Sequence, residues 1–211
     1  SMKLFSDIDP EIRGLFYICS PNNPTGRVVG SKLIRELSRK FVNSLFIIDE
    51  AYIDFCENLS VIELTEDCSN LIFIRTFSKA YSLAGLRVGY GIYNTKRLPT
   101  LQKYFNPKSI SLLSSAICKR AIELDLSRTY VKEVAEFKVY LKSLNNPNIF
   151  FNEGNFFLYR PQCGVDIYLQ RLKLHRIYVR DRSDMHGLKG FVRISIADWE
   201  TMMKNIDIIL E

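Results

Sequence analysis

Two stretches, Thr76-Phe77-Ser78-Lys79 and Ala84-Gly85-Leu86-Arg87-Val88-Gly89-Tyr90, carry the strongest indications of fold and chemistry in this chain. The apolar run at residues 70–75 predicts a buried strand that ends where hydroxyl side chains begin. The glycine-rich run at 87–93 predicts a second, tight strand. A lysine just after such a strand, between hydroxyls and eight residues before an arginine, suits an amine that forms a Schiff base beside an anchored anionic group.

The first half of the chain alternates short apolar strands with helical patterns. Further strands are predicted at 15–19 and 45–48, and a helix is predicted at 31–41 with Ser31 as its N-terminal cap. This alternation predicts an α/β domain with a mostly parallel sheet and crossover helices. Ligands of such sheets bind beyond the carboxyl ends of the strands. Three polar side chains follow predicted strand ends: Asn23, Asp49 and Lys79.

The rest of the chain predicts a long helical region and then a small α+β unit. The helical spacing of apolar residues extends from 109 to 144, with a break near 125–127. The last third predicts strands at 155–160, 177–180 and 191–196 and helices at 165–174 and 199–210, the final one capped by Asp198. We therefore divide the chain into a first domain, an interdomain helical region and a C-terminal domain, at residues 1–105, 106–144 and 145–211.

The composition argues against several classes of function. With 211 residues, 47% of them hydrophobic, the chain has enough apolar residues for a core, and no apolar run is long enough to span a membrane. The net charge of +6 is scattered, without a basic run interleaved with aromatic residues, so we expect no nucleic-acid partner. The five cysteines are odd in number and include no Cys-x-x-Cys pair, which predicts unpaired thiols in a reducing compartment. The two histidines have no cysteine or carboxylate cluster at metal-ligand spacing, so we expect no metal site.

Two further motifs precede the lysine, Ser20-Pro21-Asn22-Asn23-Pro24-Thr25-Gly26 and Ile48-Asp49-Glu50-Ala51-Tyr52. Together the three ordered motifs resemble the pyridoxal-phosphate (PLP) dependent aminotransferases of the class I/II fold, and most closely the histidinol-phosphate aminotransferase family. The resemblance extends from residue 15 to the C-terminus and implies PLP as the cofactor. It implies that residues 1–105 are the later part of a PLP-binding large domain and that 145–211 form the small domain that closes over the site.

The resemblance assigns a role to each polar residue of the motifs. Lys79 is the catalytic amine, which holds the cofactor aldehyde and moves a proton of the substrate. Asp49 faces the pyridine nitrogen and keeps it protonated, so that the ring can withdraw electrons. Tyr52 and Asn23 donate hydrogen bonds to the phenolic oxygen. The cofactor phosphate is held by Thr76, Ser78 and Arg87.

Three residues of the last third are candidates for substrate binding. Arg193 lies within an apolar strand pattern, where an unpaired arginine is costly, and a substrate carboxylate would pair it. The resemblance associates Arg180 with a substrate phosphate, and the alternative for Arg180 is a surface ion pair with Asp181. Asn155 matches a segment that lines the site in that family. Glu50 stays open between a functional role and a polar residue satisfied at a strand end.

The implied reaction transfers an amino group between an anionic or phosphorylated amino substrate and 2-oxoglutarate. The implied setting is cytoplasmic amino-acid biosynthesis by a homodimer. Two alternatives stay open: a PLP-dependent decarboxylase similar to the threonine-phosphate decarboxylases, and an inactive truncated fragment without the segment that binds the PLP phosphate.

The chain departs from the family pattern in two ways. Ala197 and Asp198 stand where the family usually has a glycine and a small hydroxyl residue, which bears on the identity of the substrate. Family members are also longer at the N-terminus, in a segment that carries a phosphate-binding helix N-terminus and an aromatic residue that stacks on the ring. We therefore expect this chain alone to bind PLP weakly and to show poor or no activity unless another chain supplies that segment.

Overall fold

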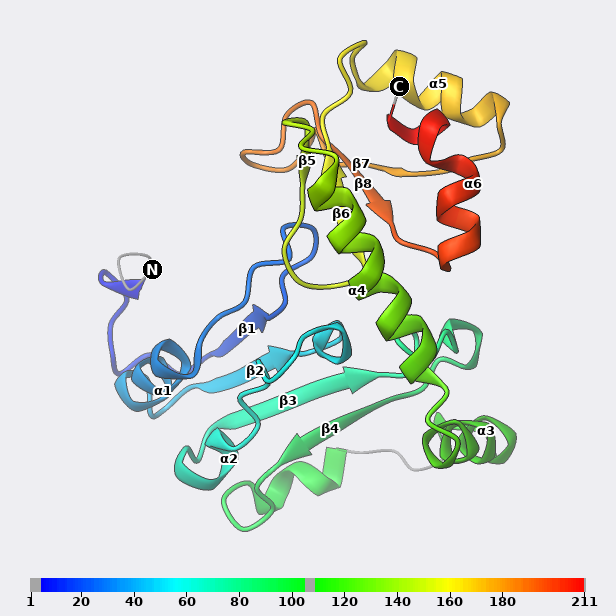
Figure 1. Cartoon of the computed structure of the whole chain (residues 1–211). Helices are drawn as coiled ribbons and strands as arrows, with labels where there is room; N and C mark the ends of the chain where they lie inside the picture. The colour runs from blue at the N-terminus through cyan, green and yellow to red at the C-terminus, as the bar shows by residue number, and fades with distance from the viewer. Residues whose placement is uncertain (1–4, 105–108, 211) are drawn as a thin grey trace.

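A computed structural model describes residues 5–104 and 109–210 of the chain. Within these residues a long helix joins a pair of four-stranded sheets (Figure 1). The first sheet has the order β1-β2-β3-β4. Its strands β1, β2 and β3 run parallel and β4 runs antiparallel to β3, so the prediction of a mostly parallel sheet is confirmed. The four strands are β1 (Leu15–Cys19), β2 (Leu45–Asp49), β3 (Leu71–Thr76) and β4 (Gly89–Tyr93).

Helices α1 (Ser31–Lys40) and α2 (Leu64–Asp67) cover one face of this sheet. The core beneath them contains Phe46, Ile48 and Phe73 from the strands, all fully buried. Side chains alternate between the two faces of a strand, so their neighbours point to the opposite face. On that opposite face Leu15 and Tyr17 of β1 remain 61% and 56% exposed.

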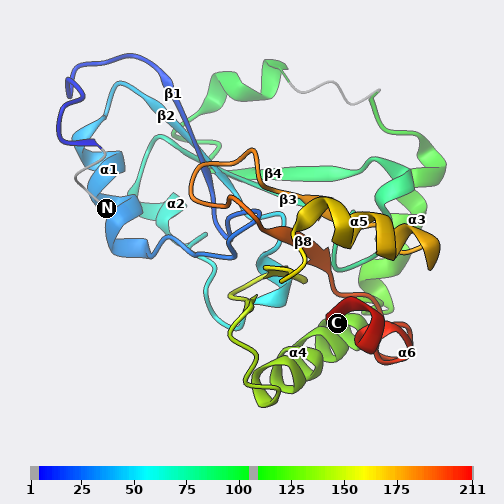
Figure 2. The same cartoon turned by 90° about the horizontal axis from the view of Figure 1, so that it is seen from above.

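The predicted helical region forms two helices with a break between them. Helix α3 (Leu112–Glu123) precedes α4 (Ser127–Ser143), and Asp125 between them has a left-handed backbone with φ of 48°. Figure 2 shows α4 lying beside α6 (Trp199–Leu210). The predicted boundary between residues 105 and 106 lies outside the described residues. We propose to keep residue 145 as the start of the small domain, since α4 ends at Ser143.

The second sheet is antiparallel and has the order β5-β6-β8-β7. Helices α4, α5 and α6 contribute the buried residues that pack with β6 and β8. This core also takes in Tyr52, Phe55 and Ala80 from loops of the first sheet, so the two halves share one apolar cluster. The elements of the second half are β5 (Ile149–Phe150), β6 (Phe156–Tyr159), α5 (Val165–Leu174), β7 (Arg180–Asp181), β8 (Val192–Ser195) and α6 (Trp199–Leu210).

Three details differ from the sequence prediction. The strand expected at 177–180 is reduced to β7, because only Arg180 and Asp181 pair with β8. The cap of α1 is Gly30, and Ser31 is the first residue of the helix. Short 3-10 helices, which the apolar periodicity did not indicate, follow the strand ends: η2 (Ile53–Phe55), η3 (Ala84–Leu86) and η4 (Pro99–Tyr104).

Candidate active site

The three polar residues predicted beyond strand ends lie at one edge of the first sheet. Asp49 is the last residue of β2, Lys79 follows the end of β3 by three residues, and Asn23 follows the end of β1 by four. Because β1, β2 and β3 are parallel, their carboxyl ends meet at this edge. The topology therefore gathers residues that are far apart in the sequence.

A cleft of about 290 Å³ opens at this edge. It is lined by both Asp49 and Lys79, and by three of the predicted phosphate anchors. A carboxylate, an amine, two hydroxyls and two guanidinium groups therefore line one small space. The full lining is Asp49, Ala51, Ile74, Arg75, Thr76, Ser78, Lys79 and Arg87.

Tyr52 and Asn23 lie beside the lysine. The Lys79 Nζ is 5.1 Å from the centroid of the Tyr52 ring. The Asn23 Nδ2 donates a hydrogen bond to the Tyr52 hydroxyl at 3.3 Å. Tyr52 is only 8% exposed and packs edge-to-face on Phe156 of β6, with ring centroids 5.1 Å apart. The second sheet thus helps to hold an aromatic ring of the first-sheet site in place.

The Asp49 carboxylate is held from both sides. Its Oδ1 accepts the Ala51 N–H at 2.9 Å, while its Oδ2 accepts hydrogen bonds from the Tyr17 hydroxyl and from the Cys19 thiol. Burial, aided by the hydrogen bond and negative charge of Asp49, raises the pKa of the Tyr17 hydroxyl. Burial and the charge of Asp49 also raise the pKa of the Cys19 thiol to about 11. Both groups are therefore protonated donors to Asp49 at neutral pH.

The segment after β3 presents hydroxyl groups in a tight turn. The Thr76 hydroxyl lies 2.9 Å from the Ser78 hydroxyl and accepts the Ser78 N–H at 3.1 Å. Arg87 has a left-handed backbone with φ of 55°, an exposed side chain, and an Nη1 that donates to the Ala84 carbonyl at 3.3 Å. Within the described residues Arg87 has no carboxylate partner at ion-pair distance, so its charge is free for an anionic group.

The structure brings Arg193 to this site from the second sheet. The Arg193 Nη1 donates to the Asn23 Oδ1 at 2.9 Å, across 170 residues of sequence. Burial lowers the pKa of Arg193, and so do the charges of Arg180 and Arg182, although the nearby Tyr52 opposes the shift. The Arg193 Nε is buried without a hydrogen-bond partner among the described residues. An incoming anion would satisfy this donor.

Arg180 stands directly opposite Arg193 in the β7–β8 pair. Both line a second hollow of about 350 Å³ together with Tyr178, Val179 and Ser195. No ion pair between Arg180 and Asp181 is found among the described residues, so the surface-pair alternative is not supported. Two guanidinium groups on one sheet face make this hollow attractive to anions.

Asn155 is not among the residues that line the lysine cleft. Its Nδ2 donates to the Tyr130 hydroxyl at 2.8 Å, and that hydroxyl donates to the Ile196 carbonyl at 2.6 Å. The Ile196 N–H in turn donates to the Asn155 carbonyl at 2.8 Å. In this structure Asn155 therefore joins α4 to the end of β8.

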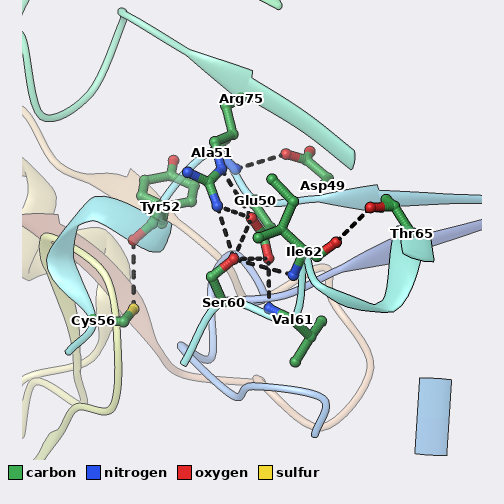
Figure 3. A network of polar contacts seen from close by, with 10 residues as sticks. All are labelled: Asp49, Glu50, Ala51, Tyr52, Cys56, Ser60, Val61, Ile62, Thr65 and Arg75. Atoms are coloured by element: carbon green, nitrogen blue, oxygen red, sulfur yellow. Dashed lines mark hydrogen bonds and ion pairs between the residues drawn. The ribbon is translucent and has the colours of Figure 1, made fainter. Parts of the chain in front are cut away.

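Sequence reasoning left the role of Glu50 open and did not name its partners Arg75 and Ser60, which form the polar network behind the cleft that Figure 3 shows. Glu50 is 1% exposed and forms an ion pair with Arg75 of β3, with 2.7 Å between Oε2 and Nη2. The Ser60 hydroxyl lies 3.1 Å from Glu50 Oε1 and 2.7 Å from Arg75 Nη2. One signal was available: Arg75 is the single charged residue of the strand predicted at 70–75, and a charge in a buried strand needs a partner.

Metal sites and membrane spans are both absent from the described residues. No group of three His, Cys, Asp or Glu side chains is arranged there to hold a metal ion. Among residues 5–104 and 109–210, no helix has the length and apolar character needed to cross a membrane. All five cysteines are unpaired in this structure.

Comparison with known proteins identifies a family. The family model "Aminotransferase class I and II" matches residues 3–209. A dihydroxyacetone phosphate transaminase of Campylobacter jejuni is 38% identical over 87% of this chain and 51% of its own length. A histidinol-phosphate aminotransferase of Buchnera aphidicola is 34% identical over 92% of this chain and 57% of its own length. The chain thus spans about half the length of these curated relatives.

Solved structures give the same architecture. The histidinol-phosphate aminotransferase of Clostridium acetobutylicum superimposes with a TM-score of 0.79 and 26% identity, over 98% of this chain and 65% of that one. The predicted fold class, an α/β domain with a mostly parallel sheet followed by a small α+β domain, is confirmed by this likeness and by the two sheets described above.

Proposed function

The chain belongs to the class I and II aminotransferases, and on that premise we propose that it carries the lysine-bearing portion of a PLP site that transfers an amino group between an anionic amino substrate and 2-oxoglutarate. The observation that carries the proposal is the cleft in which Lys79, Asp49 and Arg87 lie together. The cofactor of this family is PLP, and the residues present suit it: an amine, a carboxylate, and donors for an anionic group.

Bound PLP supplies an aldehyde that condenses with amines and a protonated ring that withdraws electrons from the bonds of the substrate α-carbon. Lys79 would hold the cofactor aldehyde, and its amine, when free, would move the proton at the substrate α-carbon. Asp49 would keep the ring nitrogen protonated. Tyr52 and Asn23, which already contact each other, would donate to the phenolic oxygen. Thr76, Ser78 and Arg87 would donate to the phosphate.

Arg193 is proposed to pair with the substrate carboxylate, because its buried Nε has no partner in the described structure. Arg180 stands opposite it and is proposed to bind a second anionic group such as a phosphate. Both curated relatives are named for phosphorylated substrates, dihydroxyacetone phosphate and histidinol phosphate, which supports a phosphorylated substrate for this site. For Asn155 we propose that it supports the site through Tyr130 and Ile196, since its amide is committed to that chain of hydrogen bonds.

The test begins with cofactor binding. Purified chain is mixed with PLP, its absorbance spectrum is recorded, and it is treated with borohydride before peptide mass mapping. We expect a pyridoxyl group fixed on Lys79, lost in Lys79→Ala and kept in Lys132→Ala, whose lysine side chain is 75% exposed on α4. A folded chain that carries no label, or label spread over surface lysines, would refute the proposed cofactor site.

The reaction type is tested once binding is found. A phosphorylated amino substrate with 2-oxoglutarate is expected to yield glutamate, at the poor rate that we expect of this chain alone. Release of carbon dioxide from phosphothreonine, without glutamate, would replace transamination by decarboxylation. The variant Arg193→Gln is expected to raise the substrate KM while leaving the PLP label on Lys79, because Arg193 is assigned to the substrate.

A further inference from the structure

A carboxylate that the proposed chemistry does not use is buried beside Asp49. Glu50 is 1% exposed, and its backbone N–H donates to the Ile74 carbonyl of β3 at 2.9 Å. Its Oε1 accepts the Val61 N–H at 3.3 Å, and both oxygens lie within 3.2 Å of the Ser60 hydroxyl. A carboxylate so far from water is costly to bury unless several hydrogen-bond donors surround it.

The main donor is Arg75. Its Nε and Nη2 reach the Glu50 Oε2 at 2.9 and 2.7 Å, and the same Nη2 reaches the Ser60 oxygen at 2.7 Å. Burial lowers the pKa of Arg75, but the hydrogen bonds and charge of Glu50 outweigh that effect and the pKa is raised. Arg75 is therefore a fixed cation whose fork of donors is shared between the buried Glu50 carboxylate and the Ser60 hydroxyl.

The location of this bridge relates it to the site. Glu50 directly follows Asp49 at the end of β2, and Arg75 directly precedes Thr76 at the end of β3. Arg75 also lines the same cleft as Lys79. The bridge ties together the two strand ends from which the carboxylate and the lysine-bearing turn emerge, and Figure 3 shows its members around Ser60.

We propose that the Glu50–Arg75–Ser60 bridge is a positioning device that fixes the separation between Asp49 and the Thr76–Lys79 turn. The inference rests on the proposed function, because it concerns the same cleft. Glu50 and Arg75 are positioning residues, which act through Asp49 and Lys79 and touch no reacting atom. Because the guanidinium donates to both Glu50 and Ser60, it restricts the ends of β2 and β3 more than a single point charge would.

The experiment compares Arg75→Gln and Arg75→Lys with a matched control, Arg35→Gln. Arg35 also pairs with a carboxylate, Asp67, but on the surface between α1 and α2, with side chains 36% and 51% exposed. Three quantities are measured well below the melting temperature. They are the PLP dissociation constant, the visible circular dichroism of bound PLP, and hydrogen exchange of peptides that cover 49–52 and 74–79 in the chain without cofactor.

We expect Arg75→Gln to weaken PLP binding by roughly tenfold, the loss that corresponds to one charge-assisted hydrogen bond. The circular dichroism band should change shape, and exchange should accelerate in the two peptides and not elsewhere. Arg75→Lys should restore little, because a lysine keeps the charge and loses the fork. Arg35→Gln should leave all three quantities unchanged. Ser60→Ala, a milder change that removes only the bridging hydroxyl, should act in the same direction and serves if Arg75→Gln fails to fold.

The inference is overturned if the Arg75 variants melt at lower temperature but keep the wild-type dissociation constant, dichroism and exchange rates. It is equally overturned if Arg75→Lys restores all three, since charge alone would then suffice. If the wild-type chain binds no PLP, the proposed function fails. Hydrogen exchange at the two strand ends still decides the positioning role.

Discussion

Replacing Gly26 by alanine is predicted to disrupt the contact between the Asn23-containing loop and residues 152–153 and so to destabilise the fold. Gly26 ends the Asn23-containing loop with φ of +68°, and its carbonyl accepts the Glu153 N–H at 3.0 Å. A Cβ at this position would overlap the Glu153 carbonyl oxygen and lie 2.8 Å from the Glu153 nitrogen and 2.9 Å from the Asn152 Cβ. These neighbours are mostly backbone, so a rotamer change does not relieve the contact.

The expected loss in the free energy of unfolding has two components, one from backbone conformation and one from broken hydrogen bonds. A left-handed backbone costs a residue with a Cβ about 1 kcal/mol. Moving residues 152–153 away breaks two hydrogen bonds, from the Glu153 N–H to Gly26 and from the Asn152 Nδ2 to the Thr25 carbonyl at 2.8 Å, each worth about 1 kcal/mol. We therefore expect Gly26→Ala to lower the free energy of unfolding by about 3 kcal/mol.

Urea unfolding followed by circular dichroism measures this loss, with Gly187→Ala as the control. Gly187 also has a positive φ, +74°, but a Cβ there meets nothing within 4 Å. It should therefore cost only the conformational component, about 1 kcal/mol. Equal losses in the two variants would refute the argument, because the close approach of residues 152–153 to Gly26 would then contribute nothing.

Three further outcomes are expected. Phe157→Ala should lower the free energy of unfolding by about 3–5 kcal/mol in urea titrations, because Phe157 is fully buried in the core that both halves share. Iodoacetamide at pH 8 should alkylate the exposed Cys163 well before Cys19, whose thiol pKa is raised to about 11. Peptide mass spectrometry measures the order of labelling, and alkylation of Cys19 before Cys163 would contradict this reasoning. Hydrogen bonds from Thr201 lower the pKa of Asp198 in the folded state, so the ionised carboxylate stabilises the fold at pH values above the pKa that Asp198 has in the unfolded chain, and this stabilisation is lost as the pH falls. The difference in free energy of unfolding between wild type and Asp198→Asn should therefore become smaller below about pH 4. A difference that stays constant with pH would contradict this reasoning.

Local patterns in the sequence were sufficient for most of the elements. The apolar runs at β1, β2 and β3 predict strands because buried parallel strands are nearly continuous in hydrophobic residues. The helix Val165–Leu174 and the cap at Asp198, whose Oδ1 accepts the Thr201 N–H at 2.9 Å, follow from periodicity and capping chemistry. The strand expected at 177–180 was overestimated, because pairing along β8 begins only at Arg180 and pairing is a tertiary property.

The sequence by itself determined the residue types of the site and their order: a lysine and a carboxylate, each just beyond a predicted strand, and several candidate anion anchors. Only the tertiary structure decided which of these meet. In the structure Arg193 donates a hydrogen bond to Asn23, 170 residues away in the sequence. Asn155 donates a hydrogen bond to Tyr130, and Glu50 forms an ion pair with Arg75. The physical reason is that periodicity and local turns report what a segment prefers, whereas contacts between distant segments depend on sheet order, register and the packing of the core that the two halves share.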